Sequence, residues 1–422
     1  MTKSVSCLVT GAVLAAALAS RLHAAGFAIH EQSGLAMGTA GAYAGAQGAA
    51  SVFYNAAGIA RLEGTQLEAG VNIIMPATEF TGPTDRPSFE TIEMDKQVFP
   101  PVDLYLSGRL TDQARWGVGL FTYMGLGTRW PEDWAGRTIT EEINLQTFTI
   151  NPTVAWFLSP STSFGFGLDL MAGHALMSKD SYTGYPFNGY VDVELEGLGV
   201  GYGFNAGLQH QVNEQLTLGL SYRSGMTLSA EGETEFTIQD VENPTHVAYL
   251  QTLFPKTDAN LDLDIPDLAI AGWEYRPANL LDGRLTWRGD LVFTRWNKYA
   301  SLDIDFETNT AGLADSYSPK LYENTWAFRT GVEYTLNEAW TLRGGWYYEQ
   351  NAVTDHMLEP SLPDAERNGV SVGASWQVRD DMALDAYFLH VMIQDRVSTF
   401  EEFPGGYESS IPILGLSMRK EF

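Results

Sequence analysis

Three things are scarce in this chain of 422 residues: cysteine, basic residues and long hydrophobic runs. The single cysteine is Cys7, so disulfides and thiolate metal sites are excluded from the rest of the chain. Lysine and arginine number 25 against 52 aspartates and glutamates, and the formal net charge is −27. This charge excludes a general nucleic-acid binder, which needs a basic surface. After residue 25, no stretch approaches ~18 consecutive apolar residues, which excludes a membrane protein built of helices.

Glycine and aromatic residues are abundant instead. The chain has 42 glycines, 11 tryptophans and 19 tyrosines, and 45% of its residues are hydrophobic. An acidic chain rich in glycine and aromatics, but without apolar runs, is typical of a large all-β protein.

The first 24 residues resemble a secretory signal peptide. Lys3 supplies a charge, residues 7–19 are apolar, and small residues precede Ala25. A lipoprotein signal around Cys7 is disfavoured because no apolar stretch precedes Val5-Ser6-Cys7. We expect a signal peptide at 1–24, a distinct segment at 25–64, and one large domain at 65–422.

From residue 65 onward, apolar and polar residues alternate with a period of two, as in 216–223 and 340–348. This alternation predicts strands with one apolar and one polar face. About fourteen such segments are expected, at 65–80, 97–110, 114–125, 142–158, 162–177, 200–212, 215–231, 263–277, 284–306, 323–336, 339–351, 367–378, 381–393 and 410–422.

The connections between these segments alternate between tight turns and long loops, the latter including 126–141, 178–199 and 232–262. This asymmetry is typical of a bacterial outer-membrane barrel, which has an even strand number and short periplasmic turns. The terminal Phe422 fits the same class, although Lys420 stands where an apolar residue is expected. We therefore predict an all-β fold, a 14-stranded antiparallel transmembrane β-barrel in the outer membrane. An exported soluble sandwich or propeller is the alternative.

Residues 26–64 are rich in glycine, alanine and serine and have almost no charge, yet they carry Phe27, Phe53 and Tyr54. A solvated linker avoids such residues. We expect a compact segment tucked inside the barrel.

Four regions of the sequence resemble the FadL family of outer-membrane transporters for hydrophobic compounds. They are the start at Ala25-Gly26-Phe27, the stretch Val52 to Ile59, Gly117 to Pro131, and later landmarks that include Leu362-Pro363-Asp364-Ala-Glu-Arg367. The second stretch resembles the family's Asn-Pro-Ala plug motif, with Ala56 in place of proline.

This resemblance implies a fourteen-stranded barrel blocked by an N-terminal hatch at 25–64. It also implies passive uptake of long-chain fatty acids or apolar aromatic compounds, which leave sideways where the third strand kinks. Gly125 and Gly127 would permit that kink, and Asn55 would hold the hatch at the gap. The alternative for each is an ordinary turn or strand-end residue.

A cation facing the lumen of so acidic a chain is informative about an anionic ligand. By their position in the resemblance, Lys179 and Lys320 are the first candidates, and His174 and Arg329 are weaker ones. A solvated loop lysine is the alternative for both lysines. Phe27 is expected to contact the ligand as well.

One long loop is predicted to contain a helix. Asn243 can cap it, Pro244 can begin it, and Val247, Leu250 and Phe254 share one face. That face is expected either to wall an entrance groove for ligand or to pack on a neighbouring loop.

No enzyme, metal or cofactor site is expected. Ser371 lies in a Gly-x-Ser-x-Gly match, but within a predicted strand and not at a nucleophile elbow. The pairs at 262–264 and 303–305 fit solvated strand faces better than Ca²⁺ sites. The expected partners are hydrophobic small molecules, membrane lipid and lipopolysaccharide, with no nucleic acid, and the chain is expected to be a monomer. A structural or adhesive barrel, or a barrel enzyme, is the alternative of a different class.

Overall fold

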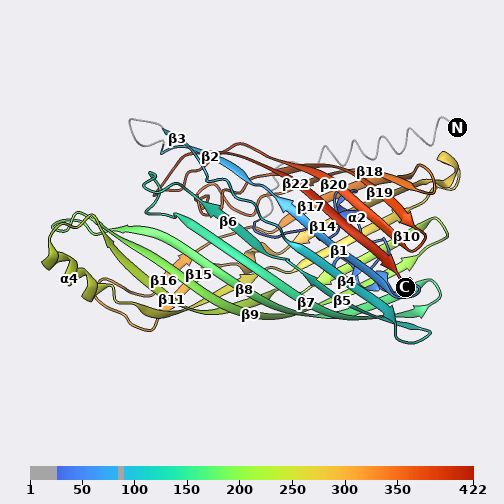
Figure 1. Cartoon of the computed structure of the whole chain (residues 1–422), viewed down its shortest axis with the longest axis horizontal. Coiled ribbons are helices and arrows are strands. Elements are labelled where there is room, and N and C mark those ends of the chain that lie inside the picture. The colour runs from blue at the N-terminus through green and yellow to red at the C-terminus, as the bar shows by residue number, and fades with distance from the viewer. Residues whose placement is uncertain (1–25, 84–89) are drawn as a thin grey trace.

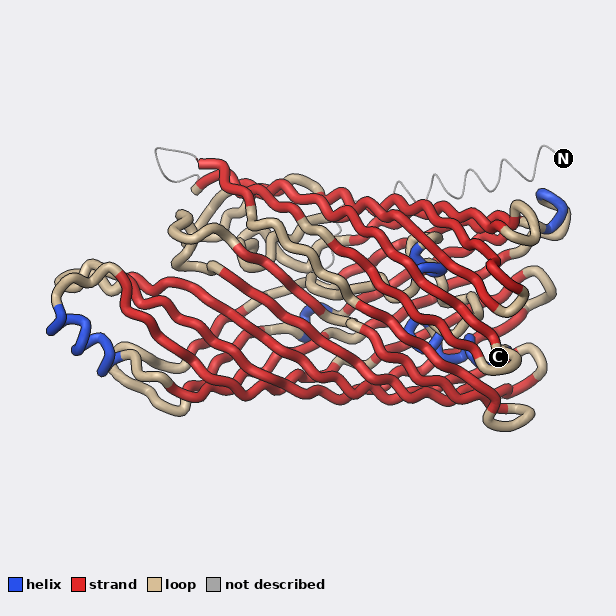
Figure 2. Tube along the Cα trace, viewed as in Figure 1, coloured by secondary structure: helices blue, strands red, loops and turns tan. Residues whose placement is uncertain are grey.

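The computed structural model describes residues 26–83 and 90–422. The predicted signal peptide therefore lies outside the described residues. The described strands form one sheet, which closes into an elongated barrel made almost entirely of strand (Figures 1 and 2).

The barrel wall has fourteen antiparallel strands, as predicted. Eight of them are interrupted and form two successive segments each, and six are continuous. The interrupted strands are β1 (Gln66–Ile74) with β2 (Ala77–Gly82), β3 (Glu90–Glu93) with β4 (Val102–Arg109), β5 (Ala114–Phe121) with β6 (Gly125–Arg129), β10 (Leu216–Arg223) with β11 (Met226–Gln239), β12 (Thr257–Ile265) with β13 (Leu268–Tyr275), β14 (Leu285–Thr294) with β15 (Ser301–Phe306), β16 (Ser316–Pro319) with β17 (Thr325–Thr335), and β20 (Met382–Ile393) with β21 (Arg396–Val397). The continuous strands are β7 (Glu142–Ser159), β8 (Thr162–Tyr182), β9 (Tyr190–Gln211), β18 (Trp340–Glu349), β19 (Arg367–Arg379) and β22 (Gly406–Glu421).

The first and last strands pair with each other and close the barrel. The β1–β22 ladder runs from the pair Gln66↔Glu421 to the pair Ile74↔Ile413. On its other side β1 pairs with β4. The wall therefore has no free edge at this point, as a membrane-spanning sheet requires.

The two faces of the wall follow the alternation in the sequence. In β8, Leu168 and Leu170 are 48% and 43% exposed, whereas Asp169 between them is fully buried. The apolar residues face outward, where lipid replaces water, and the polar residues face the interior.

Some strands reach farther than the sequence indicated. Loops were expected at 178–199 and 232–262, but β8, β9, β11 and β12 continue through much of both. Glutamates such as Glu194 and Glu196 in β9 interrupt the apolar alternation there, while the strands keep pairing with each other beyond the apolar band. The loop predicted at 126–141 likewise begins with most of β6, which is a strand because it pairs with β7.

Residues 26–62, hereafter the inner segment, are mostly buried and lie against the inward faces of the strands. They contain the short helices α2 (Gly34–Met37), α3 (Ser51–Tyr54) and η1 (Ala56–Arg61), drawn inside the barrel in Figure 2. Outside the inner segment lie α4 (Pro244–Leu253), η2 (Leu281–Gly283) and η3 (Trp296–Lys298). No helix among the described residues is long and apolar enough to cross a membrane.

Candidate ligand-transport site

A small, mainly apolar cavity lies inside the barrel, between the start of the inner segment and the strands β6, β7, β8 and β12. Its volume is about 70 Å³. Ligand pockets usually measure ~300–1,000 Å³, so side chains must move before a long ligand fits. Its apolar lining includes Phe27, Leu126, Leu145, Ala175, Leu261, Leu263 and Leu362.

The only charged groups among the described lining residues of this cavity form one ion pair. The Lys320 ammonium lies 2.7 Å from a carboxylate oxygen of Glu359, and both side chains line the cavity. Lys320 is only 8% exposed. Of the cations predicted from the sequence, Lys320 is thus the one placed at the cavity.

Phe27 projects from the inner segment into the cavity wall. Its ring packs edge-on against Trp296, at a centroid distance of 5.0 Å, and against Tyr299, at 5.6 Å. Such edge-to-face pairs are favourable beyond the area that they bury. The structure therefore places the predicted residue Phe27 beside Lys320 in one aromatic-rich cavity.

The backbone next to Phe27 is anchored by a buried ion pair. Gly26 donates its N–H to Asp364 at 3.4 Å, and its carbonyl accepts from Arg367 at 3.0 Å. Asp364 and Arg367 bond each other at 3.0 Å. Burial raises the pKa of the Asp364 carboxyl, and the neighbouring Arg367 acts in the opposite direction. Sequence analysis recognised these two residues only as landmarks, because nothing local to them indicates a partner at Gly26.

The barrel wall is broken next to the cavity. The ladder between β4 and β5 ends at the pair Leu104↔Leu120. Among the described residues, the next backbone bond across this break joins the Asp95 N–H, in the chain before β4, to the Arg129 carbonyl of β6, at 2.8 Å. The chain between β5 and β6 turns toward the interior over the intervening stretch.

The inner segment satisfies the backbone of this inward turn. Ile29 donates its N–H to the Tyr123 carbonyl at 2.9 Å, and Gly125 donates to the Phe27 carbonyl at 3.1 Å. Ala28 and Met124 form an antiparallel bridge between these two bonds. Residues 27–29 thus replace the neighbouring wall strand as the partner of residues 123–125.

Neighbouring groups approach closely at both glycines predicted at the kink. A Cβ atom on Gly125 would lie 2.6 Å from the Ile29 Cδ1 atom. On Gly127 it would lie 1.9 Å from the Phe99 Cζ atom. The Phe99 ring therefore covers β6 at the wall break. Sequence analysis missed Phe99, which lies in a predicted strand and carries no distinguishing pattern.

Asn55 contacts a different part of the wall from the one expected. Its side-chain amide donates to the carbonyls of Ala44, at 2.8 Å, and Leu208, at 3.2 Å, and its oxygen accepts from the Ala57 N–H. The prediction that Asn55 holds the gap was wrong. Leu208 lies in β9, whereas residues 27–29 make the contacts at the kink.

Two other predicted ligand residues lie away from the cavity. Lys179 is exposed near the outer end of β8, opposite Val193. His174 faces outward and bonds Glu196 at 2.7 Å, because the alternation of β8 turns Gly173 and Ala175 inward. The prediction for His174 was therefore wrong. The weaker candidate Arg329 faces inward, but it lies beside the inner segment, with Glu349 at 3.7 Å.

The predicted loop helix is α4, at the far tip of the long strands β11 and β12 (Figure 1). Asn243 caps it, as expected. Leu250 is buried, Val247 is half-buried, and the Phe254 ring lies 5.7 Å from that of Phe236. This face packs on neighbouring chain, and none of the three predicted groove residues lines the cavity.

A second hollow, of about 630 Å³, lies on the outward face of the wall. Leu220, Tyr222 and Trp326 are among its lining residues, and all three are exposed. In the membrane this face meets lipid, so the hollow belongs to the lipid-facing surface and not to the lumen.

Two relatives are similar to almost the whole chain. A long-chain fatty acid transport protein of Escherichia coli O6:H1 is 24% identical over 410 residues, covering 90% of each chain. A 47 kDa outer membrane protein of Pasteurella multocida is 25% identical, covering 98% of each.

Solved structures share the fold. A FadL homologue of Pseudomonas aeruginosa superposes with a TM-score of 0.81 at 20% identity, over 94% of this chain and 100% of its own. The toluene transporter TodX of P. putida superposes with a TM-score of 0.73 at 15% identity, over 95% and 99%. These likenesses confirm the predicted barrel, and together with the relatives they confirm the outer-membrane location.

The family model described as "Outer membrane protein transport protein (OMPP1/FadL/TodX)" matches residues 15–422. The predicted resemblance is thereby confirmed, and the chain belongs to this family of outer-membrane transporters of hydrophobic compounds.

Proposed function

We propose that this protein takes up long-chain fatty acids passively, with the inner segment acting as a hatch. The ligand binds in the cavity at Phe27 and Lys320 and leaves sideways through the wall break between β4 and the chain that joins β5 to β6. The observation that carries this proposal is a buried lysine in a mainly apolar cavity that adjoins the break. The whole path lies within one barrel, so a monomer suffices.

The physical properties of a fatty acid match this path. Each buried CH₂ group contributes about 0.8 kcal/mol, so an alkyl chain gains from an apolar route and loses little on passing directly into lipid. Leu126 of β6 lines the cavity, which links the binding site to the wall break. The carboxylate is then paired with Lys320, which must exchange Glu359 for the ligand.

Removal of the lysine tests the ligand class. A hydrogen bond to a charged group contributes about 1.5–3 kcal/mol, so Lys320→Met is expected to weaken oleate binding roughly 10- to 150-fold and to leave toluene binding unchanged. Glu359→Gln removes the competing carboxylate and is expected to strengthen oleate binding. Lys179→Met, at an exposed lysine, is the matched control. Equal oleate affinity of wild type and Lys320→Met would contradict a fatty-acid ligand.

A second candidate substrate is a monoaromatic hydrocarbon. Glu359 already neutralises Lys320, and the rings of Phe27, Tyr299 and Tyr322 line the cavity. The toluene transporters with the same fold are consistent with this substrate. The same binding assay separates the two candidates, because only the fatty acid depends on Lys320.

The lateral route is tested at Phe99. Phe99→Ala opens the covered break and is expected to raise the uptake rate, whereas Gly127→Trp fills the break and is expected to lower it. Val98→Ala is the control, since Val98 is adjacent and 59% exposed. Heat-modifiable migration on gels checks that each variant is folded. Unchanged uptake in folded Phe99→Ala and Gly127→Trp would indicate a route straight through the lumen.

A further inference from the structure

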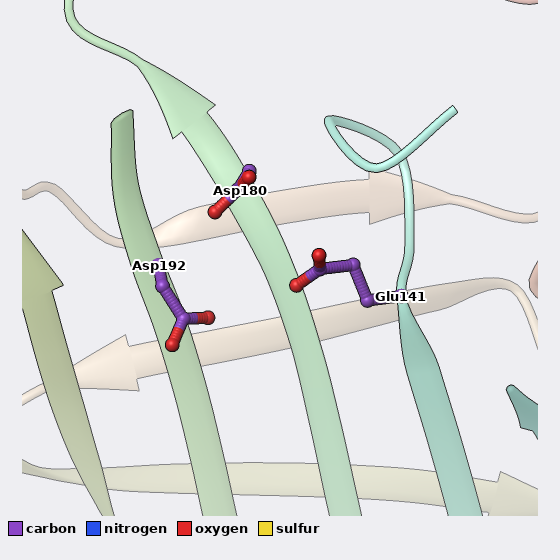
Figure 3. Close-up of side chains that lie close together, drawn as sticks. All are labelled: Glu141, Asp180 and Asp192. Atoms are coloured by element: carbon purple, nitrogen blue, oxygen red, sulfur yellow. The ribbon is translucent and has the colours of Figure 1, made fainter. Parts of the chain in front are cut away.

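Three carboxylates meet at the outer end of the wall. Glu141 immediately precedes β7, Asp180 lies near the end of β8, and Asp192 lies near the start of β9. Asp180 and Asp192 are directly opposite each other in the β8–β9 ladder. One oxygen from each of the three residues lies within 4.8 Å of the others, and Figure 3 shows the carboxyl groups converging. Sequence analysis did not find this group, because its members come from three separate segments.

One oxygen of this group is buried without a partner. The Asp180 side chain is only 2% exposed, and its Oδ2 atom lies 3.2 Å from the Arg137 Nε atom. Its Oδ1 atom is buried and has no hydrogen-bond partner. A buried carboxylate oxygen left unpaired is costly. The orphaned oxygen therefore indicates a missing positive group.

Arg137 does not balance the three carboxylates. Its guanidinium also pairs with Asp133 and lies 4.0 Å from the centre of the Tyr190 ring. The charge of Arg137 is thus shared with Asp133, and its guanidinium lies against the Tyr190 ring. Like charges directly opposite each other in a sheet are destabilising, so Asp180 and Asp192 still need a cation between them.

We propose that Glu141, Asp180 and Asp192 bind one Ca²⁺ ion. Calcium takes six to eight oxygen ligands at ~2.3–2.6 Å in flexible geometry. Two oxygens on opposite sides of such an ion are ~5 Å apart, which accommodates the spacing of this group. Three protein carboxylates supply part of the shell, and water supplies the rest.

The ion would clamp a loop over the outer end of the lumen. Glu141 ends the loop 130–141, and its carbonyl accepts from the Trp130 N–H at 2.9 Å. Trp130 and Trp134 stack with ring centroids 4.5 Å apart, and both pack against Phe80 inside the barrel mouth. Calcium at Glu141 therefore ties this aromatic layer to β8 and β9.

Calcium titration of the full-length protein in detergent, after chelator treatment, tests the site. Calorimetry is expected to show one site of roughly 10⁻⁴–10⁻³ M, the range of extracellular calcium modules, and calcium is expected to raise the thermal transition. Glu141→Gln and Asp180→Asn should each weaken binding at least tenfold. Asp262→Asn, at an exposed acid of β12, is the matched control and should bind calcium as wild type does.

Three results would overturn the proposal. One is calcium binding that is equal in wild type, Glu141→Gln and Asp180→Asn. Another is equal affinity for Mg²⁺ and Ca²⁺, which would indicate a diffuse acidic surface. The third is a thermal transition temperature that is higher in Glu141→Gln than in wild type but that calcium does not raise in wild type. This result would mean that loss of a negative charge, and not calcium binding, stabilises this end of the wall. Glu141→Gln keeps the test valid if Asp180→Asn does not fold, since Glu141 is only half-buried.

Discussion

The front and rear parts of the inner segment are held in the barrel by different means. The front part, residues 26–30, is held largely through its backbone, by the bridge to residues 123–125 and by the anchor at Gly26. It also carries Phe27 into the cavity. The front part therefore lies at the proposed ligand cavity and at the break in the wall.

The rear part, residues 41–57, is held by hydrogen bonds to buried polar side chains of the wall. Asp290 accepts from the N–H groups of Tyr43, at 2.7 Å, and Ala44, at 3.0 Å. Gln209 donates to the Ala44 and Ala46 carbonyls at 3.0 and 2.7 Å. Several wall strands thus fix the backbone of the rear part.

The bridge of residues 27–29 consists of neutral backbone bonds, whereas Asp290 holds the rear part with a charged side chain. Hydrogen bonds to charged groups contribute about 1.5–3 kcal/mol, against about 0.5–1.5 kcal/mol for neutral ones. We expect the bridge of residues 27–29 to release first and the rear part to stay in place. One continuous segment would then provide both a gate and a plug.

Deletion of residues 26–62 removes both parts and is expected to have the largest effect. The lumen would lose its contents, and a stable open conductance like that of a porin is expected in planar bilayers. The intact chain is the control. A deletion variant that is folded by its gel migration but still non-conducting would contradict the plug.

Asp290→Ala loosens the rear part alone. It leaves the Tyr43 and Ala44 N–H groups without their charged acceptor, and we expect a loss of about 1.5–3 kcal/mol in the free energy of unfolding. Denaturant titration in detergent measures it, with Glu338→Ala at an exposed turn as the control. A loss equal to that of the control would show that the rear part is not held through Asp290.

Ile29→Pro loosens the front part alone. It removes the N–H that bonds the Tyr123 carbonyl, at an expected cost of about 0.5–1.5 kcal/mol. Hydrogen exchange of residues 26–30 should become faster while that of residues 41–57 stays unchanged. Ile29→Val keeps the N–H and serves as the control. Equal acceleration in both parts would mean that the inner segment moves as one body.

Gly125→Ala is expected to have the smallest effect. The added Cβ meets the end of the Ile29 side chain, which can turn away, so we expect less than ~1 kcal/mol, below the usual cost of overpacking. The double variant Gly125→Ala/Ile29→Ala should return uptake to the level of Ile29→Ala. If it does not, the contact between the two residues is not what restricts the kink.

The wall could be predicted from the sequence because each strand carries its own alternation. Residues 216–223 indicate one apolar face whatever they pair with, and β10 spans that range. The outer extensions of β8 and β9 could not be predicted in the same way. Outside the membrane the outward face is solvated, so polar residues such as Glu194 no longer mark the end of a strand.

The site could be predicted only in part, because its contacts join distant positions. Phe27 and Lys320 were identified individually, but not the partner Glu359 of the lysine. The role of Phe99 depends on its approach to Gly127 across the wall break, and Asn55 gives no indication of whether it will bond β9 or the kink. Lys179 and Lys320 are both lysines in an acidic chain, and only the fold shows that Lys320 lines the cavity.

The pairing of β1 with β22 has a consequence for biogenesis. The seam between Gln66 and Glu421 joins the two ends of the barrel domain, so it forms only after the last strand has been made. Contacts between residues so far apart in sequence form late, because closing the intervening loop is entropically costly. The inner segment precedes β1, and its anchor at Gly26 reaches Asp364, just before β19. The sheet must therefore curl around the inner segment before the seam closes, so the barrel encloses the contents of its lumen as it forms.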